Sequence, residues 1–237
     1  MKKISVVVPT FNVEGYLEKT LESLKKQDTD FELWIIDDNS NDNSAKISQN
    51  FVHGIPDFHF EAFDTHKGIG AARNFGIDYA TNDAIAFVDG DDIISSDFIR
   101  TLSELFTKDV VATAVGYSWW RPRTSSSRQQ ILSQREMFGQ VSTHGSEIGG
   151  YVWNKAFSTQ AIKAINLRYD ESLPIAEDYL FTSTFVAKTP GQYAYDPRIL
   201  YTKVNRPNST IHTASFADRN QERKVFKQIR ELEHFMY

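Results

Sequence analysis

Three aspartates within four positions stand directly after an apolar stretch of this 237-residue chain. Asp89, Asp91 and Asp92 follow residues 84–88, and Gly90 between them lets the backbone turn tightly. Carboxylates this close repel one another unless a cation compensates them, and Mg²⁺ and Mn²⁺ prefer such oxygen ligands. The ion would take its remaining ligands from water and substrate phosphates, which suits a diphosphate leaving group. We therefore expect Mn²⁺ or Mg²⁺ as a cofactor, with Asp89 and Asp91 as ligands. The alternative is a solvated acidic turn that caps the next helix, and Asp92 in particular could simply serve the N-terminus of that helix.

A second acidic pair, Asp37 and Asp38, ends another apolar stretch. An acceptor at a strand end can take the N3–H of a uracil ring, and an aromatic face suits the base. Asp38 and Phe11 are therefore candidate nucleotide-binding residues. Alternatively, the acidic pair forms an Asx turn and Phe11 belongs to the core.

The segment Lys67-Gly-Ile-Gly-Ala-Ala-Arg-Asn74 begins a predicted helix. Gly68 and Gly70 let the backbone approach a ligand closely, and the N-terminus of a helix favours anions. Arg73 could then reach a phosphate or the ribose and base of a nucleotide; the alternative is an arginine on the surface. The glycine spacing differs from that of the Rossmann dinucleotide fingerprint, so the segment alone is a weak indication of a site.

Strand and helix patterns alternate through the first half of the chain. We expect strands at 4–8, 31–36, 58–63, 84–88 and 110–115. Helices are expected between them, one from Gly70 to Tyr79 and others capped by Asn12, by Asp42 or Asn43, and by Ser96. Such alternation predicts an α/β fold with a mostly parallel sheet flanked by helices. Ligands bind at the carboxyl ends of parallel strands, so both acidic clusters and the segment Pro9-Thr-Phe-Asn12 should meet in one crevice.

The second half of the chain has a different pattern. Residues 119–135 hold four arginines and no acidic residue, which predicts a mobile loop or an exposed hairpin. The stretch Arg121–Arg135 could close over bound donor or acceptor as a lid, or remain a solvated loop. Further strands are expected at 151–157 and at 193–205 with a break near Pro197, and helices at 177–186 and 216–237.

Composition narrows the function further. The chain has no cysteine, which excludes disulfides, thiolate zinc sites and a cysteine nucleophile. Its net charge of −5 disfavours broad nucleic-acid binding. No apolar run approaches the roughly 20 residues of a membrane helix. We expect a cytoplasmic protein with no nucleic-acid partner; peripheral contact with the inner face of the membrane and the oligomeric state stay open.

Taken together and in order, seven short segments resemble a known family. The chain resembles the inverting family 2 glycosyltransferases with the GT-A fold, of the bacterial capsule, exopolysaccharide or wall-polymer type. The matching segments, which extend to residue 210, are Val6-Val-Val-Pro-Thr-Phe-Asn12, Ile35-Ile-Asp-Asp-Asn-Ser40, Gly68-Ile-Gly-Ala-Ala-Arg-Asn-Phe-Gly-Ile77, Phe87-Val-Asp-Gly-Asp-Asp92, Tyr151-Val-Trp-Asn-Lys-Ala-Phe157, Ala176-Glu-Asp-Tyr-Leu-Phe181 and Arg206-Pro-Asn-Ser-Thr210.

The resemblance implies a division of the chain. It implies a GT-A (Rossmann-like) domain with a nucleotide-sugar-binding half at 1–115 and a smaller, mixed acceptor-binding half at 116–210. A C-terminal helical segment follows at 211–237, and its abrupt stop suggests a truncation.

The resemblance also implies roles for single residues. Asp91 matches the direct metal ligand of the Asp-x-Asp motif, Asp89 lies nearer the ribose, and Asp38 matches the uracil-binding acid. Asp178 matches the catalytic base. The other nucleotide-binding candidates are Pro9, Thr10, Phe11, Asn12, Gly68, Arg73 and Gly90. The acceptor-binding candidates are Glu177, Trp153 and Lys155; those for the diphosphate are Arg206 and Ser209, and His212 is a third metal-ligand candidate.

Alternatives stay open at several of these positions. Trp153 could stack on a sugar or belong to the core, Lys155 is equally open, and His212 could be a surface histidine. Glu177-Asp178 could merely begin a helix favourably. Two departures from the family pattern are Phe11, where many relatives have Tyr, and Ala156-Phe157 in place of Leu-Tyr.

The expected reaction is an inverting transfer of a sugar from a nucleotide diphosphate, with UDP the expected nucleotide, to a hydroxyl of a saccharide or lipid-linked acceptor. A donor sugar that leaves its diphosphate develops positive charge at the anomeric carbon, and attack from the opposite face needs a base there, the role of Asp178. Two alternatives are a sugar-phosphate nucleotidyltransferase and a non-catalytic nucleotide-sugar-binding subunit. The first would want a glycine-rich triphosphate loop after the first strand, where this chain has Pro-Thr-Phe-Asn.

Overall fold

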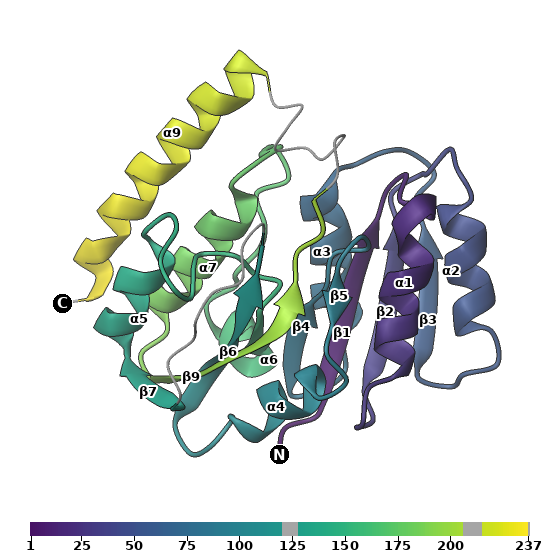
Figure 1. Ribbon diagram of the computed structural model, residues 1–237. Coiled ribbons are helices and arrows are strands. Elements are labelled where there is room, and N and C mark those ends of the chain that lie inside the picture. Colours follow the sequence, from purple (N-terminus) through teal and green to yellow (C-terminus); the bar gives the residue numbers. More distant parts are fainter. Residues whose placement is uncertain (120–127, 206–214, 237) are drawn as a thin grey trace.

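The N-terminal half is a parallel sheet with helices on both faces. The computed structural model describes residues 1–119, 128–205 and 215–236. Its first elements are β1 (Ile4–Thr10), α1 (Glu14–Lys25), β2 (Glu32–Asp37), α2 (Ser44–Val52), β3 (Phe58–Ala62), α3 (Ile69–Tyr79) and β4 (Ala84–Phe87). The strands pair in parallel in the order β3-β2-β1-β4. Helices α1 and α2 lie on one side of these strands and α3 on the other (Figure 1).

Alternate residues of β1 supply the cores on the two faces. Val6 and Val8 belong to the apolar cluster that contains Leu17 of α1, whereas Val7 packs with Ile77 of α3 on the opposite face. This is the period of two expected for a strand that is buried on both sides. The predicted strand and the helix expected after it are confirmed.

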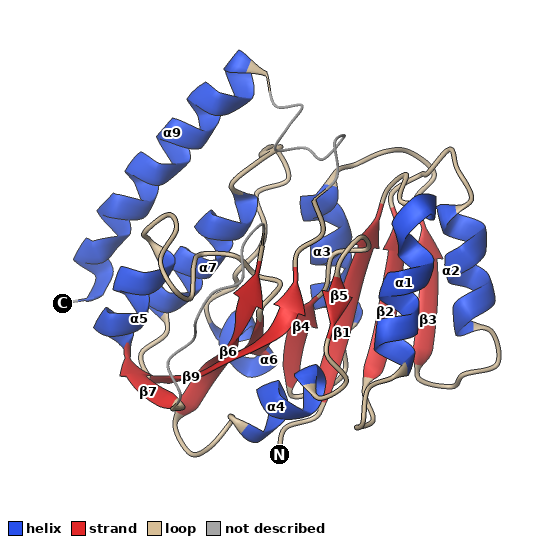
Figure 2. Cartoon of the chain, in the orientation of Figure 1, coloured by secondary structure: helices blue, strands red, loops and turns tan. Residues whose placement is uncertain are grey.

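The rest of the chain extends the same sheet with mixed strand directions. Its elements are β5 (Ile93–Ile94), α4 (Phe98–Glu104), β6 (Val110–Ser118), β7 (Gln130–Ser133), α5 (Gln134–Val141), β8 (Lys155–Ser158), α6 (Thr159–Ala164), α7 (Glu177–Lys188), β9 (Gln192–Thr202), α9 (Phe216–Glu231) and the 3-10 helix η1 (Leu232–Met236). Strand β8 runs antiparallel between β4 and β6, and β6 pairs in parallel with β9 (Figure 2). The nine strands form one sheet, which confirms the predicted mostly parallel α/β fold.

A glycine allows α3 to lie close to the sheet. A Cβ atom on Gly76 would overlap the side chain of Val7 in β1, so the close approach of helix and strand requires glycine there. The approach matters for the site because Arg73 stands almost one turn earlier on α3. Its side chain is thereby held against the sheet rather than in solvent.

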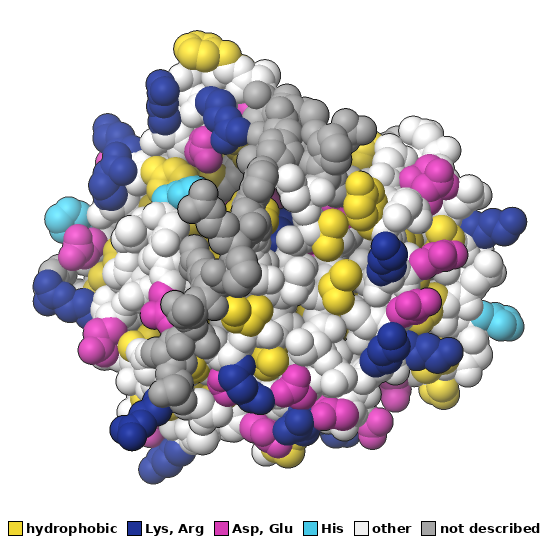
Figure 3. Space-filling view, in the orientation of Figure 1, with side chains coloured by type: hydrophobic (Ala, Val, Ile, Leu, Met, Phe, Trp, Pro, Cys, Tyr) yellow, Lys and Arg dark blue, Asp and Glu magenta, His cyan; other side chains and the backbone are white. Residues whose placement is uncertain are grey.

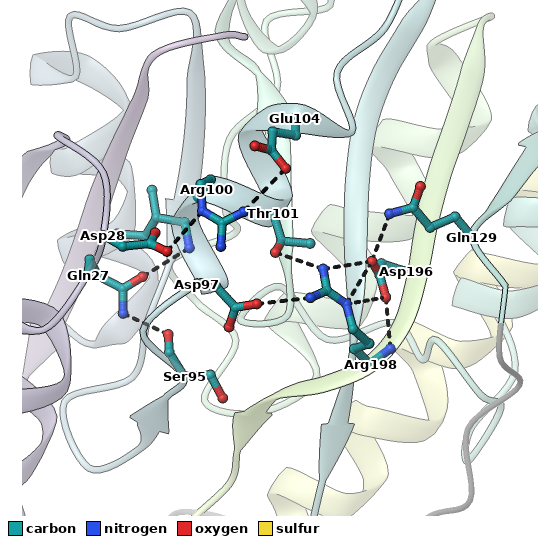
Figure 4. A network of polar contacts seen from close by, with 11 residues as sticks. Gln27, Asp28, Ser95, Asp97, Arg100, Thr101, Glu104, Gln129, Asp196 and Arg198 are labelled. Carbon is teal, nitrogen blue, oxygen red and sulfur yellow. Dashed lines mark hydrogen bonds and ion pairs between the residues drawn. The ribbon is translucent and has the colours of Figure 1, made fainter.

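The break predicted near Pro197 is a bulge inside one long strand. The register between β6 and β9 shifts between Val115 and Gly116, opposite this proline. Arg198 donates to Asp196, two residues earlier, and also to Asp97 and Thr101 at α4 (Figure 4). These contacts connect the bulge to α4 and leave the rest of β9 to continue toward the site.

Three predicted helix starts or strands need correction. Asn12 does not cap α1: its φ is 51°, and Val13 is the N-cap. Ser96 does not cap α4, because Asp97 occupies the N-cap position. The strand predicted at 151–157 begins only at Lys155, because the preceding residues fold back around the ammonium of that lysine.

The arginine-containing stretch is only partly described. Residues 120–127 lie outside the described residues, but the predicted loop ends earlier than expected, since β7 begins at Gln130 and α5 at Gln134. Ser133 and Glu136 form a capping box at the start of α5. Among the described helices, none is long and apolar enough to cross a membrane. On the face drawn in Figure 3, charged side chains of both signs are interspersed along the lower edge.

Candidate active site

The carboxyl ends of the parallel strands bring the predicted acidic groups to one edge of the sheet. Thr10 at the end of β1 is in register with Asp37 at the end of β2, and Val7 of β1 is in register with Phe87 of β4. Gly90 lies against this edge: a Cβ atom there would be 3.0 Å from Thr10 Cγ2 and 3.1 Å from the Pro9 carbonyl oxygen. Such contacts would be tighter than ordinary van der Waals contacts, so glycine suits a loop that passes this close to β1.

Asp89, Asp91 and Asp92 form a compact acid cluster. One carboxylate oxygen from each lies within 4.8 Å of the others. Asp89 and Asp91 offer hard oxygen ligands of the kind that Mg²⁺ and Mn²⁺ take, and these ions usually complete their coordination with water and phosphate. The residues present therefore fit a divalent ion.

Asp92 is mainly an anchor for the end of β9. Its carboxylate is fully buried and accepts hydrogen bonds from the Tyr201 hydroxyl at 2.6 Å, from Lys203 Nζ at 2.9 Å and from the Val204 N–H at 2.8 Å. Burial and the nearby carboxylates raise the pKa of Asp92 to about 7, while Lys203 opposes the rise. Its lone pairs are thus directed at protein donors.

Lys203 is a site residue that sequence reasoning does not single out. Its ammonium lies 2.8 Å from Asp89, 2.9 Å from Asp92 and 3.8 Å from Asp91. Burial acts to lower the pKa of Lys203, but these carboxylates more than offset it and hold the pKa above its ordinary value. Lys203 directly follows β9, so the rule that ligands gather at the carboxyl ends of strands could have indicated it.

Arg73 is buried between two carboxylates. Its guanidinium donates to Asp89 Oδ1 at 2.9 Å and to Glu177 Oε1 at 2.7 Å, and it lies over the ring of Tyr169 at 5.3 Å from the centroid. Its exposed fraction is 2%, so the surface alternative is wrong. Burial would raise the pKa of Asp89, but Lys203 and Arg73 outweigh burial and hold it well below the ordinary range.

Asp178 lies beside this bridge, at the N-terminus of α7. The helix begins at Glu177, after Ala176 in a left-handed conformation with φ 62°. The half-buried Asp178 carboxylate accepts the N–H of Tyr179 at 2.8 Å. Burial raises the pKa of Asp178 to about 7, Glu177 adds to the rise and Arg73 opposes it. A carboxylate that takes a proton near neutral pH is suited to general-base chemistry.

Asp38 connects the end of β2 to the start of α3. It is buried, and its two oxygens accept the N–H groups of Lys67 at 2.6 Å and of Gly68 at 2.7 Å. The His66 ring lies 2.9 Å from the same carboxylate and stacks on Phe11 at 4.1 Å between centroids. Phe11 is 38% exposed, so the alternative of a core position is wrong.

Asp37 and Asn12 hold the turns around this region. Asp37 accepts hydrogen bonds from Thr10 Oγ1 at 3.1 Å and from the Ser40 N–H at 2.8 Å. Asp37 thus accepts within its own turn, from the residue three positions later, whereas the carboxylate of Asp38 binds the start of α3. The exposed Asn12 accepts the N–H of Asn41 at 2.8 Å.

Trp153 and Lys155 are placed in the interior rather than at an open surface. The Trp153 ring stacks between Tyr151 and Tyr201, with centroids 4.6 Å away on each side. Lys155 is fully buried, and its ammonium donates to the carbonyls of Ile148, Gly149 and Tyr151 and to Asn154 Oδ1. Neither side chain has a face open to an acceptor. The remaining candidates Arg206, Ser209 and His212 lie outside the described residues.

Comparison with known proteins identifies a sequence family and several relatives of this chain. The sequence model of the family described as "Glycosyl transferase family 2" matches residues 5–165. The chain is 29% identical over 190 residues to the uncharacterized glycosyltransferase EpsJ of Bacillus subtilis, covering 75% of this chain and 54% of that protein. It is 27% identical over 197 residues to the poly(ribitol-phosphate) beta-N-acetylglucosaminyltransferase TarS of Staphylococcus aureus, covering 77% of this chain and 32% of that protein. The chain thus spans about half of one relative and a third of the other.

Solved structures share the fold. TarS residues 1–349 from S. aureus, in complex with UDP-GlcNAc, superpose with a TM-score of 0.79 at 21% identity, covering 97% of this chain and 66% of that one. The mannosyltransferase PcManGT from Pyrobaculum calidifontis, in complex with GDP-Man and Mn²⁺, superposes with a TM-score of 0.68 at 16% identity, covering 99% and 70%. At these identities the likeness establishes the GT-A fold.

Proposed function

This chain belongs to glycosyl transferase family 2, and we propose that it transfers a sugar from a UDP-sugar to an acceptor hydroxyl with inversion at the anomeric carbon. One observation carries the proposal: buried Arg73 bonds to both Asp89 and Glu177, so one cation joins the acid cluster to the first turn of α7, which carries Asp178. That arrangement gives one group of carboxylates for a diphosphate-bound ion and a separate carboxyl for a base. The family match favours this reaction over nucleotidyl transfer and over binding alone.

We propose that Asp91 and Asp89 hold Mn²⁺ or Mg²⁺. When bound, the ion would supply positive charge to the departing diphosphate. Asp92 holds the end of β9 in place through Tyr201 and Val204. We retain His212 as a third ligand because an imidazole can ligate a metal ion. We retain Arg206 and Ser209 as diphosphate contacts on the resemblance alone. The Mn²⁺ in the complex of PcManGT supports a divalent ion at a site of this fold.

The nucleotide is proposed to bind beside Asp38 and Phe11. Each carboxylate oxygen has two lone pairs, so Asp38 can accept a uracil N3–H while it keeps the N–H groups of Lys67 and Gly68. The half-exposed Phe11 ring offers an apolar face to the base. TarS was solved with UDP and with UDP-GlcNAc, which supports a uridine donor.

Asp178 is proposed as the base that takes the acceptor proton. Glu177 is proposed to orient the acceptor, since its carboxylate is already held by Arg73. Trp153 and Lys155 are better described as positioning residues, because both support the loop before β8 from inside. We further propose the division into a donor half at 1–115 and an acceptor half at 116–210, joined within β6 (Val110–Ser118).

A panel of UDP-sugars with Mn²⁺ tests the proposal through UDP release. We expect Asp178→Asn to bind UDP as the wild type does in calorimetry but to lose about 10²–10⁴-fold in kcat, because the amide cannot take a proton. Asp30→Asn, at an exposed acid outside the site, serves as the matched control. Retained turnover in Asp178→Asn would remove Asp178 as the base.

A further inference from the structure

The acid cluster already contains a cation of the chain itself. Lys203 Nζ makes hydrogen bonds to Asp89 and Asp92 and lies 3.8 Å from Asp91. Its side chain is 15% exposed, so little water screens these contacts. The carboxylates that would ligate a divalent ion are therefore compensated before any ion arrives.

A divalent ion and this ammonium compete for the same small volume. The three carboxylates offer oxygens within 4.8 Å of one another, and an ion bound to two of them would sit about 2.1 Å from each oxygen. The ammonium lies 2.8 Å from Asp89, one of these two ligands. Two cations this close, in a partly buried site, repel each other strongly.

We infer that Lys203 is an internal counter-cation of the acid cluster, which a divalent ion must displace from Asp89 in order to bind. This inference rests on the proposed metal site but concerns a residue outside the family motif that suggested it. The displacement is local, because Tyr201 and Val204 keep the end of β9 bound to Asp92 when the ammonium moves.

The displaced ammonium needs a new partner, and the donor supplies one. The diphosphate of a bound nucleotide brings negative charge to the same strand ends, where the side chain of Lys203 can reach it. Metal and nucleotide should therefore bind with positive coupling: the ion binds weakly alone and more tightly when UDP is present.

The test is Mn²⁺ binding by calorimetry, with and without UDP, to the wild type and to Lys203→Met. We expect the variant to bind Mn²⁺ alone about tenfold more tightly, because a like charge has been removed from the site. The enhancement of Mn²⁺ binding by UDP should shrink in the same variant. Lys203→Arg, which keeps the charge, is the control and should resemble the wild type. Lys203→Gln replaces the methionine variant if melting curves show that the latter is unfolded.

The outcomes separate the two proposals. Unchanged or weaker Mn²⁺ binding in Lys203→Met or Lys203→Gln, together with UDP-sugar turnover by the wild type, overturns the counter-cation and leaves the transferase proposal standing. Tighter Mn²⁺ binding without turnover of any UDP-sugar supports the counter-cation and overturns the transferase proposal. Absence of Mn²⁺ binding in every variant, with or without UDP, overturns both the counter-cation and the metal site.

Discussion

Lys155, which is fully buried, and Lys203, which is partly buried, are held in opposite ways. Lys155 is enclosed by neutral oxygens of the loop 148–154, and burial lowers its pKa well below the ordinary value. Lys203 is enclosed by carboxylates, which hold its pKa above the ordinary value in spite of burial. The carbonyls around Lys155 lose a charged donor if the ammonium leaves. The carboxylates around Lys203 keep a negative charge that another cation can balance. The difference separates a structural clamp from an exchangeable site.

Arg73, like Lys203, is held by carboxylates. Its replacement should give the largest change in the free energy of unfolding. Arg73→Met leaves the buried Glu177 without the guanidinium and leaves the partly buried Asp89 with Lys203 as its cation. We expect the unfolding free energy to fall by about 3–5 kcal/mol. Arg73→Lys keeps the charge but cannot span both carboxylates with a planar fork, and should be intermediate. Urea unfolding measures both. A methionine variant as stable as the wild type would mean that the bridge contributes nothing to the fold.

Lys155 tests the neutral side of the comparison. Lys155→Met removes one donor from three carbonyls and from Asn154 Oδ1. The Ile148 carbonyl keeps the Asn154 amide at 3.2 Å. We expect a loss of about 2–3 kcal/mol in unfolding free energy, because buried acceptors are left unsatisfied. Mn²⁺ and UDP affinities of the folded variant, measured by calorimetry, should stay as in the wild type. If Lys155→Met tightens Mn²⁺ binding as we expect of Lys203→Met, the distinction between the two lysines is lost.

The smallest expected effect is a pH dependence of the free energy of unfolding that arises from the carboxyl group of Asp178. Its pKa is raised from 3.8 to about 7, chiefly by burial. The folded state therefore binds the proton more tightly than the unfolded state, and the stability that this provides is lost as pH rises through about 7. Asp178→Asn avoids the loss, so it should be more stable than the wild type at pH 8 by on the order of 1–2 kcal/mol.

Melting curves of the two proteins at pH 8 and pH 5 check this expectation. The advantage of Asp178→Asn should shrink at pH 5, where the folded wild type carries the proton. An equal advantage at both values would show that Asp178 is not the group whose proton affinity rises on folding.

Local sequence patterns are sufficient to predict the parallel strands and the meeting of the acidic groups at one edge of the sheet. Apolar runs and turn residues indicate where the parallel strands lie, and parallel topology then requires Asp38 and Asp89 to meet at one edge. The start of α1 was misplaced because Asn12, a good capping residue by type, is used instead to accept the N–H of Asn41. A propensity for capping cannot distinguish these two uses.

Tertiary pairings explain what could not be predicted. Strand β9 is far from residues 89–92 in sequence. Lys203 at its end reaches the acid cluster because β9 pairs with β6 and with β5, the short strand that follows residue 92. Trp153 has the side chain for stacking on a sugar, but Tyr201 near the end of β9 covers one face of its ring. Whether Arg73 is a surface cation or a buried bridge depends on Gly76, which brings α3 against β1.

A crystal structure of the chain with UDP and Mn²⁺, with manganese located by its anomalous scattering, tests the central claim directly. The account predicts one manganese peak at Asp91, in contact with the diphosphate, and the ammonium of Lys203 moved away from Asp89. UDP bound beside the acid cluster with no manganese peak, and with Lys203 still on Asp89, would contradict it.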